Sequence, residues 1–287
     1  MTPPGHWRSN VADVRAFRQV DVFSSQPLLG NPVAVVHDAD GLSAEEMARF
    51  ARWTNLSETT FLLPPTDPAA DYRLRIWTPG GELPFAGHPT LGSAHAWLEA
   101  GGVPRSDDEV VQECGAGLVQ VRRGLRLAFA APPLLRSGPV DVDDLTRIAA
   151  ALRIDEHDIV DAAWIDNGPG WVGVLLADAA AVLACRPDPG AFGPLDIGVV
   201  GLYPPGGDVA IEVRAFCPGL GVVEDPVTGS LNAGLAQWLA GNRLPTAYVA
   251  AQGTVLGRQG RVHVSVEGDG VWVGGDTRTS ITGTIDL

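Results

Sequence analysis

The hydrophobic and polar positions along the chain predict many short strands and only a few helices. The expected strands of the first half are 15–23, 33–36, 58–63, 72–78, 110–113, 118–122 and 125–130. One helix is expected to begin after Ser43 and to end near Asn55, and a strongly apolar one covers 90–100. This succession of strands and helices predicts an α+β fold.

The second half of the chain repeats this succession with little sequence identity. Its expected strands are 163–166, 171–176, 197–203, 209–216, 248–256, 261–267 and 271–273, and its expected helices are 144–152 and 230–240. The Ala-Pro-Pro segment at 131–133 predicts a boundary between two domains. The expected division is a flexible extension over 1–14, an N-terminal domain over 15–131 and a C-terminal domain over 132–287. The last strands can pack back on the N-terminal domain.

A polar loop precedes each of the two strongly apolar helices. These loops are Pro-Phe-Ala-Gly-His-Pro-Thr at 84–90 and Glu-Asp-Pro-Val-Thr-Gly-Ser at 224–230. The start of a helix presents unpaired backbone N–H groups and a positive dipole end, which together suit a carboxylate. Two such starts about one domain apart predict a duplicated architecture that holds a ligand between its halves.

Composition and charge exclude several classes of function. A chain of 287 residues suits two domains of ordinary size, and its net charge of −14 argues against nucleic acid or an anionic membrane as partner. All 20 basic residues are arginine. Without lysine, the chain cannot carry out Schiff-base aldolase chemistry, bind pyridoxal phosphate as an internal aldimine, or build the usual phosphate-binding loop.

The cysteines and the N-terminus predict a cytoplasmic protein. Three widely spaced cysteines fit a reducing compartment better than a disulfide framework. The first residues show no apolar signal segment, and no apolar run approaches the ~20 residues that span a bilayer.

The sequence predicts neither a bound metal nor a cofactor. The histidines and cysteines lack the spacing of a metal site. The stretch Gly-Pro-Gly-Trp-Val-Gly at 168–173 matches the dinucleotide-binding pattern in letters only, because it leads into a strand and places proline where an N–H is needed. We interpret it as a hairpin turn.

Three polar residues are candidates for chemistry. Glu58 enters an apolar strand, where desolvation would raise its pKa toward the range of a general acid/base; the alternative is a rim glutamate that faces water. His88 stands between glycine and proline at a helix start, where it either acts on a ligand or caps a backbone group. Asp225 is either a second acid/base or part of an acidic turn that caps the helix after it.

Taken together, these segments resemble the PhzF-like (phenazine biosynthesis) proteins. The motifs that carry the resemblance are Phe-Arg-Gln-Val-Asp-Val-Phe at 17–23, Gly-Asn-Pro-Val-Ala-Val-Val at 30–36, the segment 55–61, and the two polar loops, in that order. The resemblance covers nearly the whole chain from about Arg15 onward. It implies the diaminopimelate epimerase-like fold, in which two pseudo-symmetric α+β domains each wrap a mixed sheet around a central helix and the active site lies in the cleft between them.

The resemblance also implies roles for six residues. Glu58 matches the catalytic acid/base of the family, and His88 and Asp225 match its polar partners. The substrate-binding positions implied in the same way are Gly87, Gly229 and Ser230. Related epimerases and proline racemases use one cysteine on each loop, whereas both loops here lack a thiol and Cys217 is expected to be ill-placed to replace one.

The expected function is therefore that of a cofactor-independent isomerase. It would move a proton between carbons of a small carboxylated, unsaturated or cyclic substrate, similar to dihydro-3-hydroxyanthranilate, with Glu58 as the base. One alternative is an epimerase or racemase that uses Glu58 and Asp225 from opposite faces. A second is a small-acid-binding protein without turnover. Family resemblance alone implies a homodimer.

Overall fold

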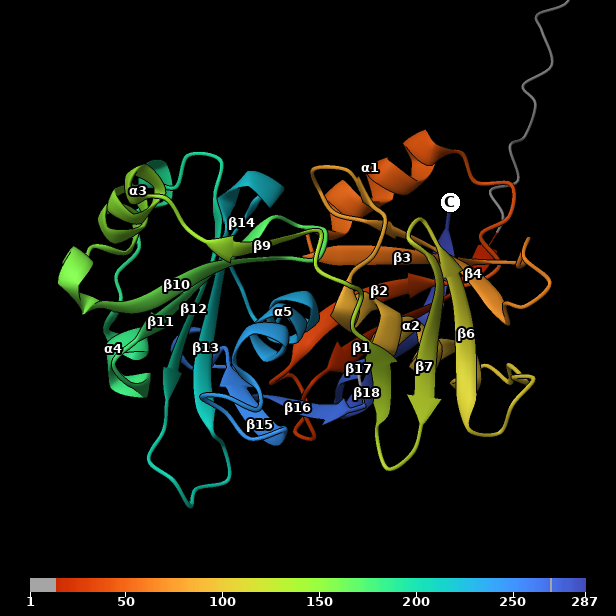
Figure 1. Cartoon of the computed structure of the whole chain (residues 1–287). Coiled ribbons are helices and arrows are strands. Elements are labelled where there is room, and N and C mark those ends of the chain that lie inside the picture. Colours follow the sequence, from red (N-terminus) through yellow and green to blue (C-terminus); the bar gives the residue numbers. More distant parts are fainter. Residues whose placement is uncertain (1–13, 269) are drawn as a thin grey trace, which may run out of the picture.

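The computed structural model describes residues 14–268 and 270–287 (Figure 1). Apart from Val14, which begins the first strand, the predicted N-terminal extension lies outside the described residues. The first half contains the strands β1 (Val14–Val22), β2 (Asn31–Val36), β3 (Glu58–Leu63), β4 (Tyr72–Trp77), β5 (Glu82–Leu83), β6 (Glu109–Cys114), β7 (Gly117–Arg123) and β8 (Leu127–Ala130), with the helices α1 (Ala44–Thr54) and α2 (Gly87–Glu99).

The second half begins with β9 (Arg136–Pro139) and α3 (Val142–Leu152). It continues with β10 (Ile159–Asp166), β11 (Trp171–Leu176), α4 (Ala179–Ala184), β12 (Asp196–Leu202), β13 (Ile211–Cys217), β14 (Val222–Asp225), α5 (Gly229–Leu239), β15 (Ala247–Gln252), β16 (Gly260–Glu267), β17 (Gly270–Gly275) and β18 (Thr277–Asp286). Short 3₁₀ turns fall at 156–158, 189–191, 218–220 and 254–256. The predicted α+β class is confirmed.

Helix α2 is the centre of one half of the molecule. It contacts β1, β2, β3, β6, β7, β8 and β18, so strands surround it on most sides (Figure 1). Nearly every residue from Gly87 to Ala96 is buried. Gly92 permits this close packing, because a Cβ at that position would lie 2.4 Å from Cγ1 of Val33 on β2. A helix that is apolar on all faces belongs inside a protein, and α2 fits that rule.

Helix α5 has the same place in the other half. It contacts β10, β11, β16 and β17, and its residues from Gly229 to Ala236 are buried. Gly198 on β12 lets Leu231 of α5 approach the sheet, since a Cβ there would lie 2.1 Å from the leucine Cδ1. One large hydrophobic cluster includes residues of both α2 and α5.

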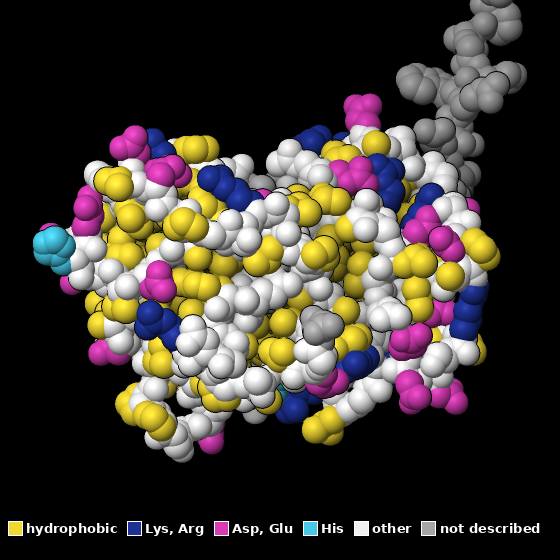
Figure 2. All heavy atoms as spheres, in the orientation of Figure 1, with side chains coloured by type: hydrophobic (Ala, Val, Ile, Leu, Met, Phe, Trp, Pro, Cys, Tyr) yellow, Lys and Arg dark blue, Asp and Glu magenta, His cyan; other side chains and the backbone are white. Residues whose placement is uncertain are grey.

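The remaining helices cover the outer faces of the sheets. Helix α1 packs Met47, Phe50 and Ala51 on one separate apolar cluster, and α3 and α4 pack on another. The predicted start of α1 is confirmed, because Ser43 caps the helix and Glu46 bonds back to it. Figure 2 shows acidic side chains scattered over both halves of one face, with arginines among them. Among the described residues, every helix is too short or too polar to cross a bilayer.

Several elements differ from the sequence-based expectation. Strand β18 was missed because polar residues dominate it and most of them are exposed; it pairs with β1 along its whole length. The short helix α4 and the strands β5, β9 and β14 were also missed. The strand expected over 248–256 ends at Gln252, because Gly253 turns the chain with a φ of +87° into a 3₁₀ turn. Helix α2 begins at Gly87 rather than at 90, so His88 belongs to its first turn.

Candidate active site

The starts of the two central helices meet. A Cβ on Gly87 would lie 2.9 Å from Cα of Gly229, and a Cβ on Gly229 would lie 3.1 Å from Cα of Gly87. Only glycine allows two backbones to approach so closely. Neither helix has a side-chain cap at its N-terminus. The first-turn N–H groups and the positive dipole ends of both helices therefore converge on one place, which we call the helix junction.

Glu58 is the first residue of β3 and lies beside the helix junction. Its side chain is 14% exposed, and its Oε2 atom lies 3.3 Å from Nε2 of His88. Both of these atoms are buried without a hydrogen-bond partner, since their geometry is not that of a hydrogen bond. Burial, and next the negative charge of Asp225, raise the pKa of the Glu58 carboxyl well above its usual range. The desolvated carboxylate expected from the sequence is what the structure has at this position.

His88 is the second residue of α2 and is buried, with 3% of its side chain exposed. Burial lowers the pKa of His88 to about 3, and a hydrogen bond to the Pro32 backbone opposes this only in part. His88 is therefore neutral at physiological pH. Its Nδ1 atom lies 3.3 Å from the amide nitrogen of Asn31. A neutral imidazole can accept or donate a proton but does not attract a carboxylate as a cation would.

Asp225 ends β14 and accepts three hydrogen bonds. The donors are Nδ2 of Asn31 at 3.0 Å, Oγ of Ser57 at 3.0 Å and Oγ1 of Thr228 at 2.6 Å. Burial raises the pKa of Asp225, and the three donors act against that rise. Asn31 also donates to the Val227 carbonyl at 2.9 Å, so one amide connects both halves of the chain. Asp225 is thus a fixed carboxylate whose surroundings favour its charged form more than those of Glu58 do.

A buried glutamine holds the loop that carries Asp225. Nε2 of Gln252 donates to the Asp225 carbonyl at 3.2 Å and to Oγ1 of Thr228 at 2.9 Å. Its Oε1 accepts from the Thr228 backbone and from Asn232, both at 3.0 Å. Sequence reasoning assigned no role to Asn31, Ser57 or Gln252. The Gly-Asn-Pro letters around Asn31 were the one available signal.

Ser230, the second residue of α5, is held by two residues of the β10–β11 hairpin. Nε1 of Trp171 donates to the Ser230 hydroxyl at 3.1 Å, and Nδ2 of Asn167 donates to its carbonyl at 2.8 Å. The hairpin expected at 168–173 is confirmed, because β10 and β11 pair antiparallel around it. Its residues at the site were not predicted.

Cys217 lies closer to these carboxyl groups than the sequence suggested. It ends β13, whose Ala215 pairs with Asp225. Burial raises the pKa of the Cys217 thiol well above its usual range, and the charges of Asp225, Asp196 and Glu58 raise it further. A thiol in this environment stays protonated, which disfavours its use as a base.

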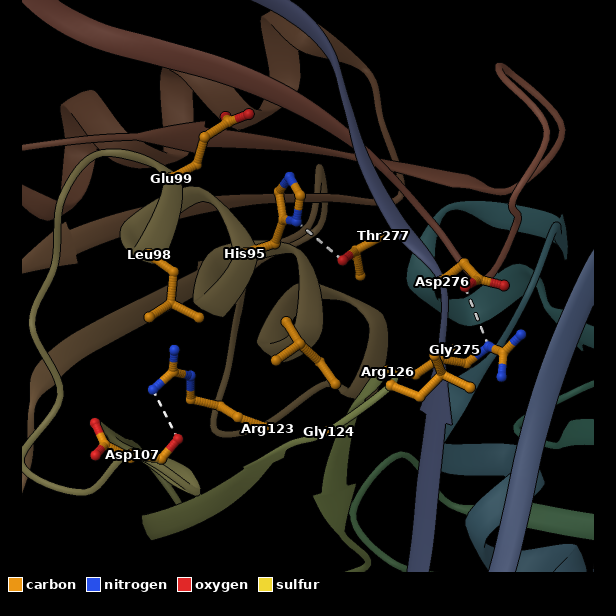
Figure 3. A pocket seen from close by; sticks show the side chains of 12 residues that line it. His95, Leu98, Glu99, Asp107, Arg123, Gly124, Arg126, Gly275, Asp276 and Thr277 are labelled. Carbon is orange, nitrogen blue, oxygen red and sulfur yellow. Dashed lines mark hydrogen bonds and ion pairs between the residues drawn. The ribbon is translucent and has the colours of Figure 1, made fainter.

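A separate cavity of about 640 Å³ lies at the far end of α2 (Figure 3). His95 is half-buried there and bonds to Thr277 and Thr279 of β18. Arg126 pairs with Asp276, and Arg123 donates to the Asp107 carbonyl. Because its polar groups bind one another, this cavity is a weaker candidate for chemistry than the helix junction. Within the described residues, no group of three or more His, Cys, Asp or Glu side chains could hold a metal ion.

Comparison with known proteins finds relatives along almost the whole chain. The family profile described as "Phenazine biosynthesis-like protein" (PhzC-PhzF) matches residues 20–285. The chain is 37% identical over 257 residues to the trans-2,3-dihydro-3-hydroxyanthranilate isomerase of Pseudomonas aeruginosa, with 88% of this chain and 90% of that protein covered. It is also 37% identical over 289 residues to antisense-enhancing sequence 1 of Schizosaccharomyces pombe. That alignment covers 93% of this chain and 97% of the other protein.

Solved structures give the same picture of the fold. A phenazine biosynthesis protein of the PhzF family from Enterococcus faecalis superposes with a TM-score of 0.79 at 26% identity, over 96% of this chain and all of that one. A hydroxyproline epimerase from Agrobacterium vitis superposes with a TM-score of 0.59 at 15% identity, over 98% and 94% of the two chains. The epimerase-like fold expected from the sequence is confirmed.

Proposed function

The chain belongs to the PhzC-PhzF family of phenazine biosynthesis-like proteins, and from that premise we propose that it is a cofactor-independent isomerase. The reaction moves a proton between two carbons of a small carboxylated substrate that is unsaturated or cyclic. A compound of this class is trans-2,3-dihydro-3-hydroxyanthranilate, after which the Pseudomonas aeruginosa relative is named.

The contrast between Glu58 and Asp225 is the observation that carries this proposal. Asp225 accepts three hydrogen bonds, whereas Oε2 of Glu58 has no hydrogen-bond partner. Two carboxyl groups whose surroundings separate their pKa values are typical of a site in which one stays charged and the other carries the proton. Glu58 is the proton carrier in this assignment, and Asp225 is the fixed charge.

The helix junction supplies the means to hold the substrate carboxylate. The N-termini of α2 and α5 meet there through Gly87 and Gly229, and the hydroxyl of Ser230 lies in the first turn of α5. Backbone N–H groups at two helix starts favour a negative charge. The proposal therefore places the substrate carboxylate at this junction, with its reacting carbons toward Glu58.

The chemistry needs no oxidant or reductant. The Glu58 carboxylate takes a proton from a carbon next to an activating group, and the electron pair of that C–H bond moves into the conjugated system. The Glu58 carboxylic acid then returns the proton to another carbon, which regenerates the carboxylate. His88, neutral and 3.3 Å away, helps to orient the substrate and assists the proton movement. Acid/base help of this kind contributes about 10²–10⁴-fold, and positioning at the site supplies the rest.

Two other functions compete with this one. An epimerase with Glu58 and Asp225 as opposed bases would invert a stereocentre without moving a double bond. The three donors on Asp225 weaken it as a base, which counts against that reading. A binding protein without turnover would hold a small acid without exchange of its C–H protons with solvent.

The wider setting of the proposed enzyme rests on the sequence. We propose a homodimer in the cytoplasm, with a small carboxylate as the only partner and neither nucleic acid nor membrane bound. The net charge of −14 supports the exclusion of polyanionic partners. Light scattering coupled to size-exclusion chromatography would test the dimer.

Proton NMR in D₂O tests the proposed reaction directly. Trans-2,3-dihydro-3-hydroxyanthranilate is incubated with the wild type, with Glu58→Gln, and with Glu45→Gln as a control on the exposed start of α1. The wild type and the control should move the double bond, with deuterium appearing at a ring carbon, and Glu58→Gln should not. Inversion without migration would favour the epimerase, and binding without exchange would favour the binding protein.

A further inference from the structure

Asp196 is a buried carboxyl group that the proposed chemistry does not use. It is the first residue of β12 and is 8% exposed. In the part of the chain that the structure describes, no group donates a hydrogen bond to its side chain and no cation pairs with it. Burial, and next the charge of Asp166, raise the pKa of Asp196 to about 7. Its carboxyl oxygens are not fully enclosed, so water or a ligand can supply the donor that the protein does not.

Strand register places Asp196 on the face of the sheet that carries the start of α5. Successive side chains of a strand alternate between faces, and Gly198, two residues on, lies directly against Leu231 of α5. Asp196 therefore shares that inner face. It pairs in register with Trp171 of β11, whose indole binds the hydroxyl of Ser230. The carboxyl of Asp196 is thus a direct neighbour of a residue that contacts the helix junction.

The next strand supports the same placement. Ile197 pairs with Phe216, which sets Asp196 beside Cys217 on β13. The charges of Asp225, Asp196 and Glu58 all act on the Cys217 thiol. Asp196 thus lies beside Cys217, on the strand that also pairs with the segment of Asp225.

A second acceptor without a donor lies on this side of the site. Oδ1 of Asn167 is buried and unpaired, although its amide nitrogen donates to the Ser230 carbonyl. Asp196 and Asn167 are thus two acceptors without donors among the described residues: Asn167 contacts Ser230 directly, and Asp196 pairs with Trp171, which contacts Ser230. An apolar ligand would leave them unsatisfied, whereas a ligand with N–H or O–H groups would satisfy them.

We propose that Asp196 binds an amino or hydroxyl group of the substrate, at a distance from the substrate carboxylate held by the helix junction. This inference rests on the proposed function and narrows its substrate class. The preferred substrates would be small acids that carry at least one hydrogen-bond donor besides the carboxyl group. Acids of the same size without such a donor would bind through the carboxylate alone.

Isothermal titration calorimetry at pH 8, where Asp196 is ionised, tests this assignment with two probes. Benzoate carries the carboxylate alone, and 3-hydroxyanthranilate adds an amino and a hydroxyl group to the same ring. The wild type should bind 3-hydroxyanthranilate at least about tenfold more tightly than benzoate. Asp196→Ala should weaken the binding of 3-hydroxyanthranilate by about tenfold to a hundredfold, the range for a hydrogen bond to a charged group. The affinity for benzoate should stay unchanged.

Two further variants make the test specific. Asp196→Asn keeps the shape and one acceptor, so its affinity for 3-hydroxyanthranilate should fall between those of the wild type and Asp196→Ala. Asp208→Ala removes an exposed aspartate from the same half and should match the wild type for both probes. Equal losses for the two probes, or no loss for either, would overturn the assignment of Asp196.

The outcomes also separate this inference from the proposed function. If the wild type binds neither probe, the carboxylate site at the helix junction fails, and the role of Asp196 fails with it. If the probes behave as expected but trans-2,3-dihydro-3-hydroxyanthranilate shows no proton transfer with the wild type, the isomerase proposal fails. Asp196 then remains a ligand-binding residue of a protein with another activity.

Discussion

Glu58 and Asp225 are carboxyl side chains from the two halves of the chain, the first mostly and the second more fully buried, and their surroundings differ. Asp225 accepts three hydrogen bonds and sits on a loop that Gln252 fastens at two points. Glu58 has a neutral histidine 3.3 Å away and no hydrogen bond at Oε2. Because the residue types are so similar, the difference arises from their surroundings. This difference supports the proposed roles, in which Asp225 stays a fixed carboxylate and Glu58 changes its protonation state.

The largest expected effect is that of replacing the Glu58 carboxyl group. Glu58→Gln should lower kcat by about 10²–10⁴-fold, the usual range for loss of an acid/base group, because glutamine cannot carry the proton. Affinity for 3-hydroxyanthranilate should stay nearly the same. Steady-state kinetics with parallel calorimetry would measure both quantities. A fully active variant would show that Glu58 does not carry the proton and that its difference from Asp225 has no catalytic role.

Asp225 should affect Glu58 through its negative charge. The charge of Asp225 raises the pKa of Glu58. Asp225→Asn should therefore lower that pKa and move the acid limb of the kcat/KM profile to lower pH, along with a loss of at least about tenfold in rate. A pH–rate profile of the variant with remaining activity would show the shift. An unmoved acid limb would mean that the two carboxyl groups do not interact.

The two glycines of the helix junction should differ in their tolerance of a methyl group. A Cβ on Gly87 would lie 2.7 Å from Cζ of Phe129, whereas the closest contacts of a Cβ on Gly229 are 3.1–3.2 Å. Gly87→Ala should cost about 1–3 kcal/mol in the free energy of unfolding, as overpacking does, and Gly229→Ala should cost less. Urea unfolding of both variants measures the order. The reverse order would show that the C-terminal half is the more rigid.

The smallest expected effect is on how stability varies with pH. The pKa of Glu58 is raised above its ordinary value of 4.5 in the folded protein, so the native state keeps a proton that the unfolded chain has lost. The stability from this group is full below about pH 4.5 and is lost as pH rises through the native pKa. Glu58→Gln does not titrate, so its melting temperature relative to that of the wild type should increase from pH 4 to pH 8. A constant difference would mean that Glu58 titrates normally.

Much of the fold could be read from the sequence because its signals are local. The expected bounds of β3 and β11 match the structure, and the cap of α1 follows from Ser43 and Glu46. Polar β18 gave no such signal, because its pairing with β1 joins residues more than 250 positions apart. Tertiary pairing of this kind leaves no trace in a window of ten residues.

The residues of the candidate site also fall into those that the sequence indicated and those that it did not. The local pattern around Glu58 indicated a desolvated carboxyl, and family resemblance named His88, Asp225 and Ser230. The residues that support the site could not be predicted from the sequence. Asn31 binds Asp225 across 194 positions, and Trp171 binds Ser230 across 59. Which donors reach a carboxylate is decided by how distant segments pack, and only the folded chain shows it.

The pairing of the first strand with the last has a consequence for biosynthesis. Val14 pairs with Asp286, and Val22 pairs with Thr277, so β18 lies along the whole of β1 and also contacts the central helix α2. A ribosome makes β18 after every other described strand. Until then the apolar surface of α2 that β18 covers stays open to solvent or to a chaperone. The half that carries Glu58 therefore waits for a strand made after all the others described, and a chain that lacks 278–287 would lose most of that strand.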